Sequence, residues 1–439
     1  MYDKPVLVVG AGPTGLTLAI DLARRGVHCR VIDARTSAFE GSRGKGLQPR
    51  TLEIFEDLGV LNDILDAGGP YPKLRLHWGR LSLPLGFIGA KARPTDGVPY
   101  PNVWMMPQAT TERILRERLH ALGISVEFGS ALLRFEQDAD GVQAALSTGE
   151  TLRASFLVGA DGGHSTVRGA LGLKLEGAAL GDKPLHVADL GIDGLDRNHW
   201  HVWPFAKGGL IALCPLAGTT LFQLFSEAQV SPENIGEVIL KGSGHHVSRV
   251  AWMSAYRPSV RMVNRYRVGK VFLAGDAAHV HPPAGAQGLN TGVQDAYNLG
   301  WKMAHVIHGC EDSLLDTYEA ERLPIAAAVL GLSKRLLQTR SLKRGAATNQ
   351  LALHYRSSSL SKGVSFGALR PGDRMPDARL PDGSRLFDHL RGPHATELCV
   401  KDGTRILIRP DGYVGQISGN PAAEYFGTPV RQVHCALTR

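Results

Sequence analysis

Three aspartates follow short apolar runs at points where glycine interrupts the chain. Asp33 closes the expected strand of residues 27–32, Asp161 closes the sequence LVGAD, and Asp276 closes the sequence FLAGD. A carboxylate in such a place accepts hydrogen bonds from hydroxyl groups. A helix that starts just beyond it offers free N–H groups and a partial positive charge. The three points predict binding platforms for a ligand that carries both hydroxyls and negative charge.

The first platform contains the glycine pattern GAGPTG at residues 10–15. An expected strand precedes the pattern, and an expected helix follows it, before the strand that ends at Asp33. Gly10 allows the tight turn, Gly12 lets the backbone approach a pyrophosphate, and Gly15 lets helix and strand pack closely. Asp33 can bind ribose hydroxyls. The complete unit predicts a dinucleotide site, but it does not distinguish NAD from FAD.

Residues 271–290 are expected to form another platform of a strand, a turn and a helix start, without the nucleotide glycine pattern. A buried strand is expected to end at Gly275 and Asp276, and a loop rich in proline and glycine follows. A helix is expected from Gly288 to Ala304. Its free N–H groups would face whatever the loop encloses, which favours an anionic group.

A basic loop lies between the first platform and the next expected helix. The sequence GSRGKGLQPR at residues 41–50 carries three glycines together with Arg43, Lys45 and Arg50. Its basic side chains could face phosphates or another anionic group, or the loop could simply be solvated.

Residues 186–262 are expected to form a second, antiparallel sheet. Aromatic-lined strands can wall a pocket for a planar substrate, although aromatic residues also fill the core of any sheet. Both interpretations stay open for Trp200, Trp203, Phe205, Phe222 and Phe225. The nearby histidines lack partners at metal-ligand spacing, so no metal site is predicted.

Composition excludes several classes of protein. The chain has 439 residues, enough for two or three cores, with a net charge of +8 from scattered basic residues. Scattered charge does not favour nucleic-acid binding. The five cysteines lie far apart and predict neither a disulfide framework nor a zinc site, so a reducing cytoplasm is expected. Neither a signal peptide nor a membrane span is indicated.

Taken together, the motifs resemble those of the FAD-dependent aromatic hydroxylases, the single-component (class A) flavoprotein monooxygenases. The branch that contains phenol hydroxylases and polyketide hydroxylases is the most similar. The resemblance covers nearly the whole chain. It rests on VVGAGPTGLTLA with Asp33, SRGKGLQPRTLEIFEDLGV, PQATTERILRERL, LVGADGGHSTVR and FLAGDAAHVHPPAGAQGLNTGVQDAYNLGWKMA.

The resemblance implies an α/β fold with a Rossmann-like FAD-binding domain of the glutathione-reductase-like type, built on a parallel sheet. That domain would take residues 1–75, 105–180 and 265–340. A substrate-binding domain with a mixed or antiparallel sheet would take residues 76–104 and 181–264. Residues 341–439 would form a linker and a small C-terminal domain. This last piece resembles a shortened thioredoxin-like remnant, because residues 393–405 leave little room for the usual middle of that domain.

The resemblance also implies which residues bind FAD. The ADP part would lie near the first platform, and Gln108 would reach the ribityl or pyrophosphate region. Asp161 would serve both FAD and the nicotinamide cofactor, Asp276 the ribityl chain, and the loop before Gly288 the flavin ring. The implied set is Gly10, Gly12, Pro13, Thr14, Gly15, Asp33, Ala34, Arg35, Arg43, Gln108, Asp161, Gly275, Asp276, Pro283, Gly285, Ala286, Gln287, Gly288, Leu289 and Asn290.

The implied reaction uses NAD(P)H and O2 to hydroxylate an aromatic or polycyclic phenol-like compound through a flavin C4a-hydroperoxide. The flavin does the chemistry, so no side chain is assigned as acid or base, although Arg43 and Pro283 would lie next to the ring. Candidate substrate contacts are Trp203, Phe205, Pro215 and Phe222. Basic Arg43 and Lys45 favour NADPH over NADH.

Other activities remain open. The same flavin chemistry could inactivate an antibiotic, or the protein could be a flavin reductase or oxidase that inserts no oxygen. A non-enzymatic binder on the same fold is a further alternative, which the complete AGAQGLNTG loop disfavours. The expected partners are a small aromatic substrate and O2. Nucleic acid and integral membrane association are not expected, and the protein would be a monomer or homodimer.

Overall fold

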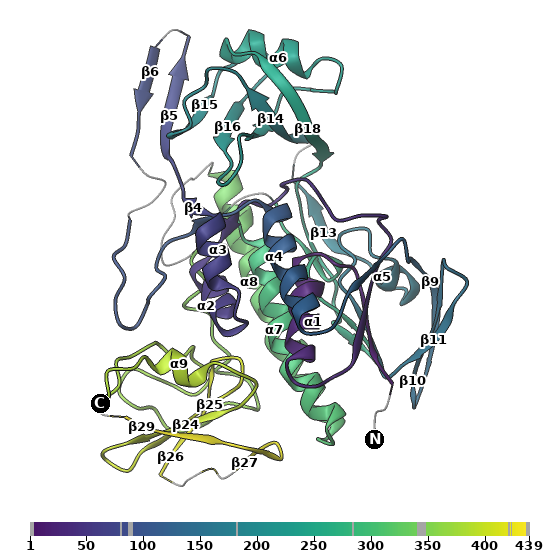
Figure 1. The fold of residues 1–439 in the computed structure, drawn as a ribbon, viewed down its shortest axis with the longest axis vertical. Coiled ribbons are helices and arrows are strands. Elements are labelled where there is room, and N and C mark those ends of the chain that lie inside the picture. Colours follow the sequence, from purple (N-terminus) through teal and green to yellow (C-terminus); the bar gives the residue numbers. More distant parts are fainter. Residues whose placement is uncertain are drawn as a thin grey trace.

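The computed structural model describes residues 4–79, 81–86, 91–180, 183–282, 285–339, 348–419, 422 and 424–435. Figure 1 shows a seven-stranded sheet at one end of the molecule, a layered α/β unit in the middle, and a C-terminal sheet at the other end. Two long helices, α7 (Gly288–Ile307) and α8 (Asp316–Gln338), run through the middle unit.

The middle unit is built on a six-stranded sheet with the order β20-β21-β12-β1-β2-β8. Its strands are β1 (Val6–Val9), β2 (Cys29–Asp33), β8 (Val126–Phe128), β12 (Phe156–Gly159), β20 (Arg267–Val268) and β21 (Val271–Leu273). All of these pairings are parallel except that of β20 with β21. The predicted α/β class with a parallel sheet is therefore confirmed.

The central strands of this sheet are fully buried because helices and smaller sheets surround them. Helix α1 (Pro13–Ala23) packs against α7 and against α4 (Gln108–Ala121). The other helical elements of this unit are α2 (Pro49–Asp57), α3 (Leu61–Ala67), α5 (Thr166–Ala170), the short η1 (Gly275–Ala277) and η2 (Asp312–Leu315).

Three small sheets join the middle unit. One contains β9 (Leu132–Asp138), β10 (Gly141–Leu146) and β11 (Thr151–Ala154), and another contains β3 (Gly46–Leu47), β4 (Gly69–Pro70) and β7 (Trp104–Met105). The third contains β13 (Glu176–Ala179), β19 (Ser259–Met262) and β22 (His279–Val280). In the parts of the chain that the structure describes, no helix is both long and apolar enough to cross a membrane.

The seven-stranded sheet has the order β18-β14-β17-β16-β15-β5-β6. Its strands are β5 (Lys73–Trp78), β6 (Leu81–Pro84), β14 (Leu185–Ile192), β15 (His199–Trp203), β16 (Ile211–Pro215), β17 (Phe222–Ser226) and β18 (Val247–Tyr256). Only the pairing of β15 with β5 is parallel. Helix α6 (Ile235–Ser243) packs on one face, where Ile235 and Ile239 join a core that includes Leu213 and Leu224.

The C-terminal unit has a five-stranded sheet and a hydrophobic core of its own. Its elements are β23 (Lys362–Gly363), β24 (Thr396–Val400), β25 (Arg405–Ile408), β26 (Val414–Ser418), β29 (Arg431–Cys435) and α9 (Leu386–Leu390), with a hairpin of β27 (Glu424–Tyr425) and β28 (Thr428–Pro429). The proposed domain boundaries and the likeness to a shortened thioredoxin-like domain stay predictions.

Buried charges attach the C-terminal unit to the middle unit. Arg409 donates two hydrogen bonds to Glu321 of α8, at 2.7 and 2.9 Å, and Lys302 of α7 donates to the same carboxylate at 2.7 Å. Burial acts to raise the pKa of Glu321, but the opposite effect of Arg409 and Lys302 is larger and holds that pKa well below its usual range. The unit therefore depends on charges supplied by α7 and α8.

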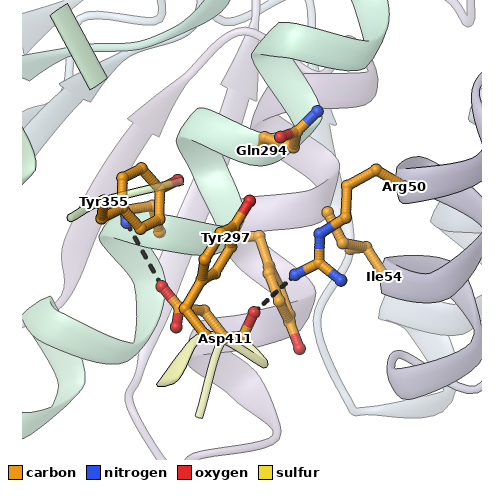
Figure 2. Close-up of a pocket in the computed structure, with 8 residues that line it drawn as sticks. Arg50, Ile54, Gln294, Tyr297, Tyr355 and Asp411 are labelled. Atoms are coloured by element: carbon orange, nitrogen blue, oxygen red, sulfur yellow. Dashed lines mark hydrogen bonds between the residues drawn. The ribbon is translucent and has the colours of Figure 1, made fainter. Parts of the chain in front are cut away.

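The turn after Arg409 enters a polar pocket at the same junction. Asp411 accepts a hydrogen bond from Arg50 at its backbone oxygen, at 2.6 Å, and one from Asn298 at its carboxylate, at 3.3 Å. Figure 2 shows the Arg50 side chain directed toward Asp411. The carboxylate also accepts from Trp301 at 3.1 Å. The pocket is lined by Arg50, Ile54, Gln294, Tyr297, Asn298, Tyr355, Asp411 and Tyr413.

The segment that follows α8 was predicted to be part of a linker, but its described end is buried. Thr348 and Gln350 are only 3% and 4% exposed. Gln350 accepts a hydrogen bond from Gln294 at 2.6 Å and donates one to Gln287 at 2.8 Å. This stretch therefore connects the C-terminal unit to the start of α7, where sequence alone indicated only a polar connection.

We expect the substitution Arg409→Met to lower the free energy of unfolding by about 3–5 kcal/mol, because it leaves Glu321 and Asp411 buried without their main cation. Thermal and urea unfolding followed by circular dichroism measure this loss. The exposed pair of Arg113 and Glu117 on α4 is the control, and Arg113→Met should cost less than about 1 kcal/mol. Equal effects of the two substitutions would contradict the role of the buried charges.

Candidate functional site

The glycine turn after β1 has the shape that a pyrophosphate requires. Gly10 has a φ of +105°, and a Cβ there would overlap the carbonyl oxygen of Ala160. A Cβ at Gly15 would overlap the carbonyl oxygen of Gly10, which shows how closely α1 packs on β1. Gly12 instead has no protein atom within 4 Å of an added Cβ, and it caps α1 without a side-chain partner. The open space therefore lies where the free N–H groups of α1 point.

Asp33 lies at the end of the neighbouring strand and is held as a carboxylate. It accepts hydrogen bonds from the Ala11 backbone N–H at 2.8 Å and from Arg35, whose Nη2 atom donates at 2.8 Å. Burial acts to raise the pKa of Asp33, but these donors outweigh burial and lower it. Ala34 is exposed between Asp33 and Arg35. The arrangement fits an acceptor for ribose hydroxyls beside the turn.

The two oxygens of the Asp161 carboxylate have different surroundings. Its Oδ2 atom accepts from the backbone N–H groups of Thr166 and Val167, at 2.7 and 3.2 Å, and so caps α5. Its Oδ1 atom is buried and has no hydrogen-bond partner among the described residues. Burial raises the pKa of Asp161. A buried oxygen without a donor fits a hydroxyl supplied by a bound cofactor.

Asp276 is the second residue of η1, in the turn that follows β21. Asp276 as a whole residue is exposed to solvent. Burial of its carboxyl by the surrounding protein nevertheless raises the pKa of that group, whereas His279 and Arg43 act to lower the pKa. Gly275 has a φ of +61°, and a Cβ there would overlap the side chain of Thr14 from α1. The third platform therefore packs directly on the helix of the first.

The loop that leads into α7 is held in an unusual backbone conformation. Ala286 has a φ of +54°, a left-handed conformation that is costly for a residue with a Cβ. Gln48 donates to the Gly285 oxygen at 2.8 Å, and its backbone N–H donates to Asn290 at 2.7 Å. Asn290 in turn donates to the Gly46 oxygen at 2.8 Å. Such a braced loop is typical of functional sites.

The first turn of α7 carries no acidic residue and no side-chain cap, so the N–H groups near Gly288 and Leu289 are available to an anion. Gln287 is fixed by hydrogen bonds to the oxygens of Gly285 and Thr348, at 2.8 and 3.0 Å. Pro283, which was predicted next to the flavin ring, lies outside the described residues.

Gln108 and Arg43 have different surroundings. Gln108 accepts a hydrogen bond from the Gly44 backbone N–H at 3.1 Å and donates to Glu112 at 2.8 Å, so it ties the basic loop to α4. Arg43 is exposed, and its guanidinium lies 5.8 Å from the centre of the Phe39 ring. Contacts of both residues with a cofactor stay predictions.

Three of the four candidate substrate residues share one face of the seven-stranded sheet, and Phe205 is separate from them. Trp203 and Phe222 belong to the core under α6, and Pro215, the cross-strand partner of Phe222, shares their face of the sheet. Phe205 is 73% exposed beyond the end of β15. The structure therefore places three of the four predicted substrate contacts on the face that α6 covers.

The opposite face of the same sheet meets the basic loop. Gln223 donates to the Ser42 oxygen, and Lys45 donates to Gln223 at 2.6 Å and lies 4.3 Å from the ring centre of Trp200. Trp252 packs so closely on the loop that a Cβ at Gly41 would overlap its ring. Sequence analysis did not select Gln223 or Trp252. Strand alternation could have paired Gln223 with Phe225, but not shown which face the loop covers.

Asp189 is a buried carboxyl on this loop-facing side. It is the cross-strand partner of both Gln223 and Trp252 and is only 2% exposed. Its Oδ1 atom has no hydrogen-bond partner among the described residues. Burial raises its pKa to about 6, although Ser42 and Lys45 act to lower it. Among the residues near the loop it is the carboxyl best placed to change charge near neutral pH.

Comparison with known proteins decides the family. Residues 3–333 match the family model described as an FAD binding domain. A flavin-dependent monooxygenase of Mycobacteroides abscessus is 41% identical over 97% of this chain and 100% of its own length. The chain belongs to the flavin-dependent monooxygenases. The predicted resemblance to the FAD-dependent aromatic hydroxylases is confirmed, and the geometry around Gly12, Asp161 and Asp276 fits FAD.

Two further relatives place this monooxygenase within its family. A rifampicin monooxygenase of Streptomyces venezuelae is 32% identical over 94% of this chain and 95% of its own length. A solved ternary complex of aklavinone-11 hydroxylase with FAD and aklavinone superposes with a TM-score of 0.82, at 26% identity over 97% of each chain.

A buried cluster behind the site stabilises the cofactor loops of the monooxygenase. Asp295 of α7 accepts hydrogen bonds from the Gly275 backbone N–H at 3.1 Å and from Arg322 at 2.8 Å, and it pairs with His279 at 2.6 Å. Burial acts to raise the pKa of Asp295, but His279 and Arg322 lower it. His279 thus forms a buried structural hydrogen bond. Sequence analysis did not select Asp295 or Arg322. The signal that could have identified this pair is an acidic residue on the buried face of a helix.

The raised pKa of Asp189 predicts how stability depends on pH. The folded protein holds this proton more tightly than the unfolded chain, so the stability it contributes is present at low pH and lost as the pH rises through about 6. The substitution Asp189→Asn removes this loss. Relative to the original protein, the variant should gain about 3 kcal/mol between about pH 4 and about pH 7.

Urea unfolding at a series of pH values measures this gain. Asp193→Asn is the control, because Asp193 directly follows β14 but its side chain is exposed. A difference between the Asp189 variant and the original protein that stays constant with pH would refute the assignment.

Proposed function

We propose that this monooxygenase uses NAD(P)H and O2 to hydroxylate an aromatic or polycyclic phenol-like compound. The substrate would bind against the face of the seven-stranded sheet that carries Trp200 and Gln223. One observation carries the proposal. Residues 41–46 contact that face through Lys45 and contact the first turn of α7 through the bond from Asn290 to Gly46. The predicted flavin site and the substrate face proposed here therefore share one short loop.

The relatives support an aromatic substrate. A pentachlorophenol 4-monooxygenase of Sphingobium chlorophenolicum, named for a phenol, is 31% identical over 98% of this chain and 90% of its own length. An electron-rich ring of this kind needs no side-chain base to become reactive, which agrees with the absence of an assigned catalytic acid or base.

Bound FAD would accept a hydride from NAD(P)H and deliver one oxygen atom from O2 to the substrate ring. The chain's own residues would position and stabilise it. Asp161 and Asp276 would accept hydrogen bonds from its hydroxyls, and the turn at Gly12 would enclose its pyrophosphate. The N–H groups at the start of α7 would stabilise negative charge on the ring. The remaining predicted contacts, including Pro283, belong to the same proposal.

The structure weakens the argument from the sequence for NADPH over NADH, which used both Arg43 and Lys45. Lys45 is already engaged with Gln223 and Trp200. Exposed Arg43 is then the loop residue best placed to meet an additional phosphate. We retain NADPH as the proposed donor on this basis. A cytoplasmic location and a monomeric or homodimeric state also stay predictions.

Oxidative inactivation of an antibiotic is a second candidate function. The observation in its favour is the similarity to a rifampicin monooxygenase, which extends over nearly the whole chain. It uses the same site and the same chemistry, and only the identity of the substrate separates it from the first candidate.

Phenolic compounds that stimulate NAD(P)H oxidation by the FAD-loaded protein provide the test of function. A product that is heavier by one oxygen atom, with the label recovered from isotopic O2, is the expected result. Oxidation of NAD(P)H with no product of increased mass for any compound would instead indicate a reductase or oxidase.

The substitution Asp276→Ala should weaken FAD binding by about tenfold or more, because one charged acceptor of the cofactor is removed. Equilibrium titration of the apoprotein with FAD, followed by flavin fluorescence, measures the dissociation constant. Asp140→Ala, in the exposed turn before β10, is the matched control and should leave it unchanged. Unaltered FAD affinity in a folded Asp276 variant would refute the role given to Asp276.

A further inference from the structure

Gln350 lies behind the start of α7 and contacts that helix with both ends of its side-chain amide. Its Nε2 atom donates a hydrogen bond to Gln287 at 2.8 Å, and its Oε1 atom accepts one from Gln294 at 2.6 Å. A longer contact of 3.4 Å joins the Nε2 atom to the hydroxyl of Thr291. These three partners are spaced by four and three residues, so they share one face of α7. One buried side chain from beyond α8 therefore contacts two turns of the helix.

Two backbone carbonyls fix the direction of these hydrogen bonds. The Nε2 atom of Gln287 donates to the oxygens of Gly285 and Thr348, at 2.8 and 3.0 Å, and a carbonyl oxygen can only accept. The Oε1 atom of Gln287 must therefore be the acceptor that meets Gln350. Gln350 then has only its Oε1 atom left for Gln294. The three amides thus have a single orientation, and the Gln350 amide is the central one.

This chain of amides joins two strained points of the backbone. In the parts of the chain that the structure describes, three residues other than glycine have a positive φ. Two of them are Gln350, with a φ of +62°, and Ala286, with a φ of +54°, which directly precedes Gln287. A residue with a Cβ keeps this conformation only where its surroundings hold it. The bond between Gln350 and Gln287 connects the two strained points.

Gln287 is the N-cap residue of α7, but its side chain does not cap the helix. It is folded back over Gly285, where an added Cβ would lie 3.4 Å from its Cγ atom. The N–H groups of the first turn therefore have no side-chain cap and no acidic residue beside them. If Gln350 no longer held it, the Oε1 atom of Gln287 would be free to turn toward those N–H groups and compete with a bound anion.

We propose that Gln350 is a positioning residue for the flavin ring. By holding the Gln287 amide behind the loop, it keeps Ala286 in its left-handed conformation and leaves the N–H groups at the start of α7 open to the ring. This inference rests on the proposed function, which places the ring at that loop. It deepens that proposal, because the segment that supplies Gln350 lies outside all the sequence motifs of the FAD site.

The substitution Gln350→Gly separates the role of the amide from that of the backbone. Glycine adopts a positive φ without strain, so this variant relieves the left-handed conformation while it removes all the amide contacts. The affinity for oxidised FAD should fall by about fivefold, because Gln287 then competes for the N–H groups. Titration of the apoprotein with FAD, followed by flavin fluorescence, measures the dissociation constant.

The midpoint potential of bound FAD is the readout that a purely structural role would not change. Reduced flavin carries more negative charge than oxidised flavin, so it depends more on the N–H groups at the start of α7. In Gln350→Gly the reduced form should lose about tenfold more affinity than the oxidised form. For a two-electron couple this difference lowers the potential by about 30 mV. Spectroscopic titration against a reference dye measures it.

The matched control is Gln229→Gly, at an exposed glutamine in the connection between β17 and α6. It should change neither the FAD affinity nor the potential. Gln350→Asn is a second test variant, because asparagine tolerates a left-handed backbone but is too short to meet Gln287 and Gln294 together. It should shift the affinity and the potential in the same direction as Gln350→Gly, and it keeps the test decisive if the glycine variant does not fold.

A double variant tests the route through Gln287. If Gln350 acts through that residue, Gln350→Gly should change the potential little in a Gln287→Ala background. The double variant and the Gln287→Ala single variant should then bind FAD with dissociation constants within about twofold of each other. Fully additive effects of the two substitutions would overturn the proposed route.

The remaining outcomes separate the two proposals. A folded Gln350→Gly or Gln350→Asn variant with an unchanged potential would overturn the positioning role and leave the proposed function intact, even if the melting temperature fell. The expected shifts in a protein that hydroxylates no phenolic compound would overturn the proposed hydroxylation and support the positioning role. Failure of the original protein to bind FAD would overturn both.

Discussion

The structure depends on the close approach of backbone segments at the carboxyl ends of three neighbouring strands. Gly10 touches the turn that carries Asp161, and Gly275 touches Thr14 beneath the turn that carries Asp276. Only glycine leaves room for these contacts, and both glycines also adopt a positive φ. Because β1, β12 and β21 are parallel and in register, three turns that are far apart in the sequence meet at one place. The cofactor site is a consequence of that packing.

The basic loop connects this cofactor site with the sheet face proposed for the substrate. Gly46 and Gln48 are bonded to the loop before α7, while Ser42 and Lys45 are bonded to Gln223 on the seven-stranded sheet. A glycine-rich segment suits such a position, because it must pass between two surfaces without side chains that obstruct either. A ligand that changes the contacts of this sheet face would therefore act on a loop that also contacts the proposed flavin site.

The C-terminal unit serves a different purpose. It lies at the end of the molecule opposite the seven-stranded sheet (Figure 1), away from the face proposed for the substrate. Its core is small, and its attachment relies on Arg409 and Asp411, which are buried among charged partners from α7 and α8. The buried segment around Gln350 links this attachment to Gln287 in the cofactor loop. The unit thus stabilises the start of α7 from behind.

The sequence alone determined the fold class, the nucleotide turn and the three aspartate platforms, because each depends on local rules for glycine, buried strands and helix starts. Only the tertiary structure indicated which face of the seven-stranded sheet we propose for the substrate. Strand alternation requires Trp200 and Trp203 to lie on opposite faces, but it cannot show which face α6 covers and which meets the basic loop. Asp189 and Asp295 were hidden for the same reason, because their partners come from strands and helices far away in the chain.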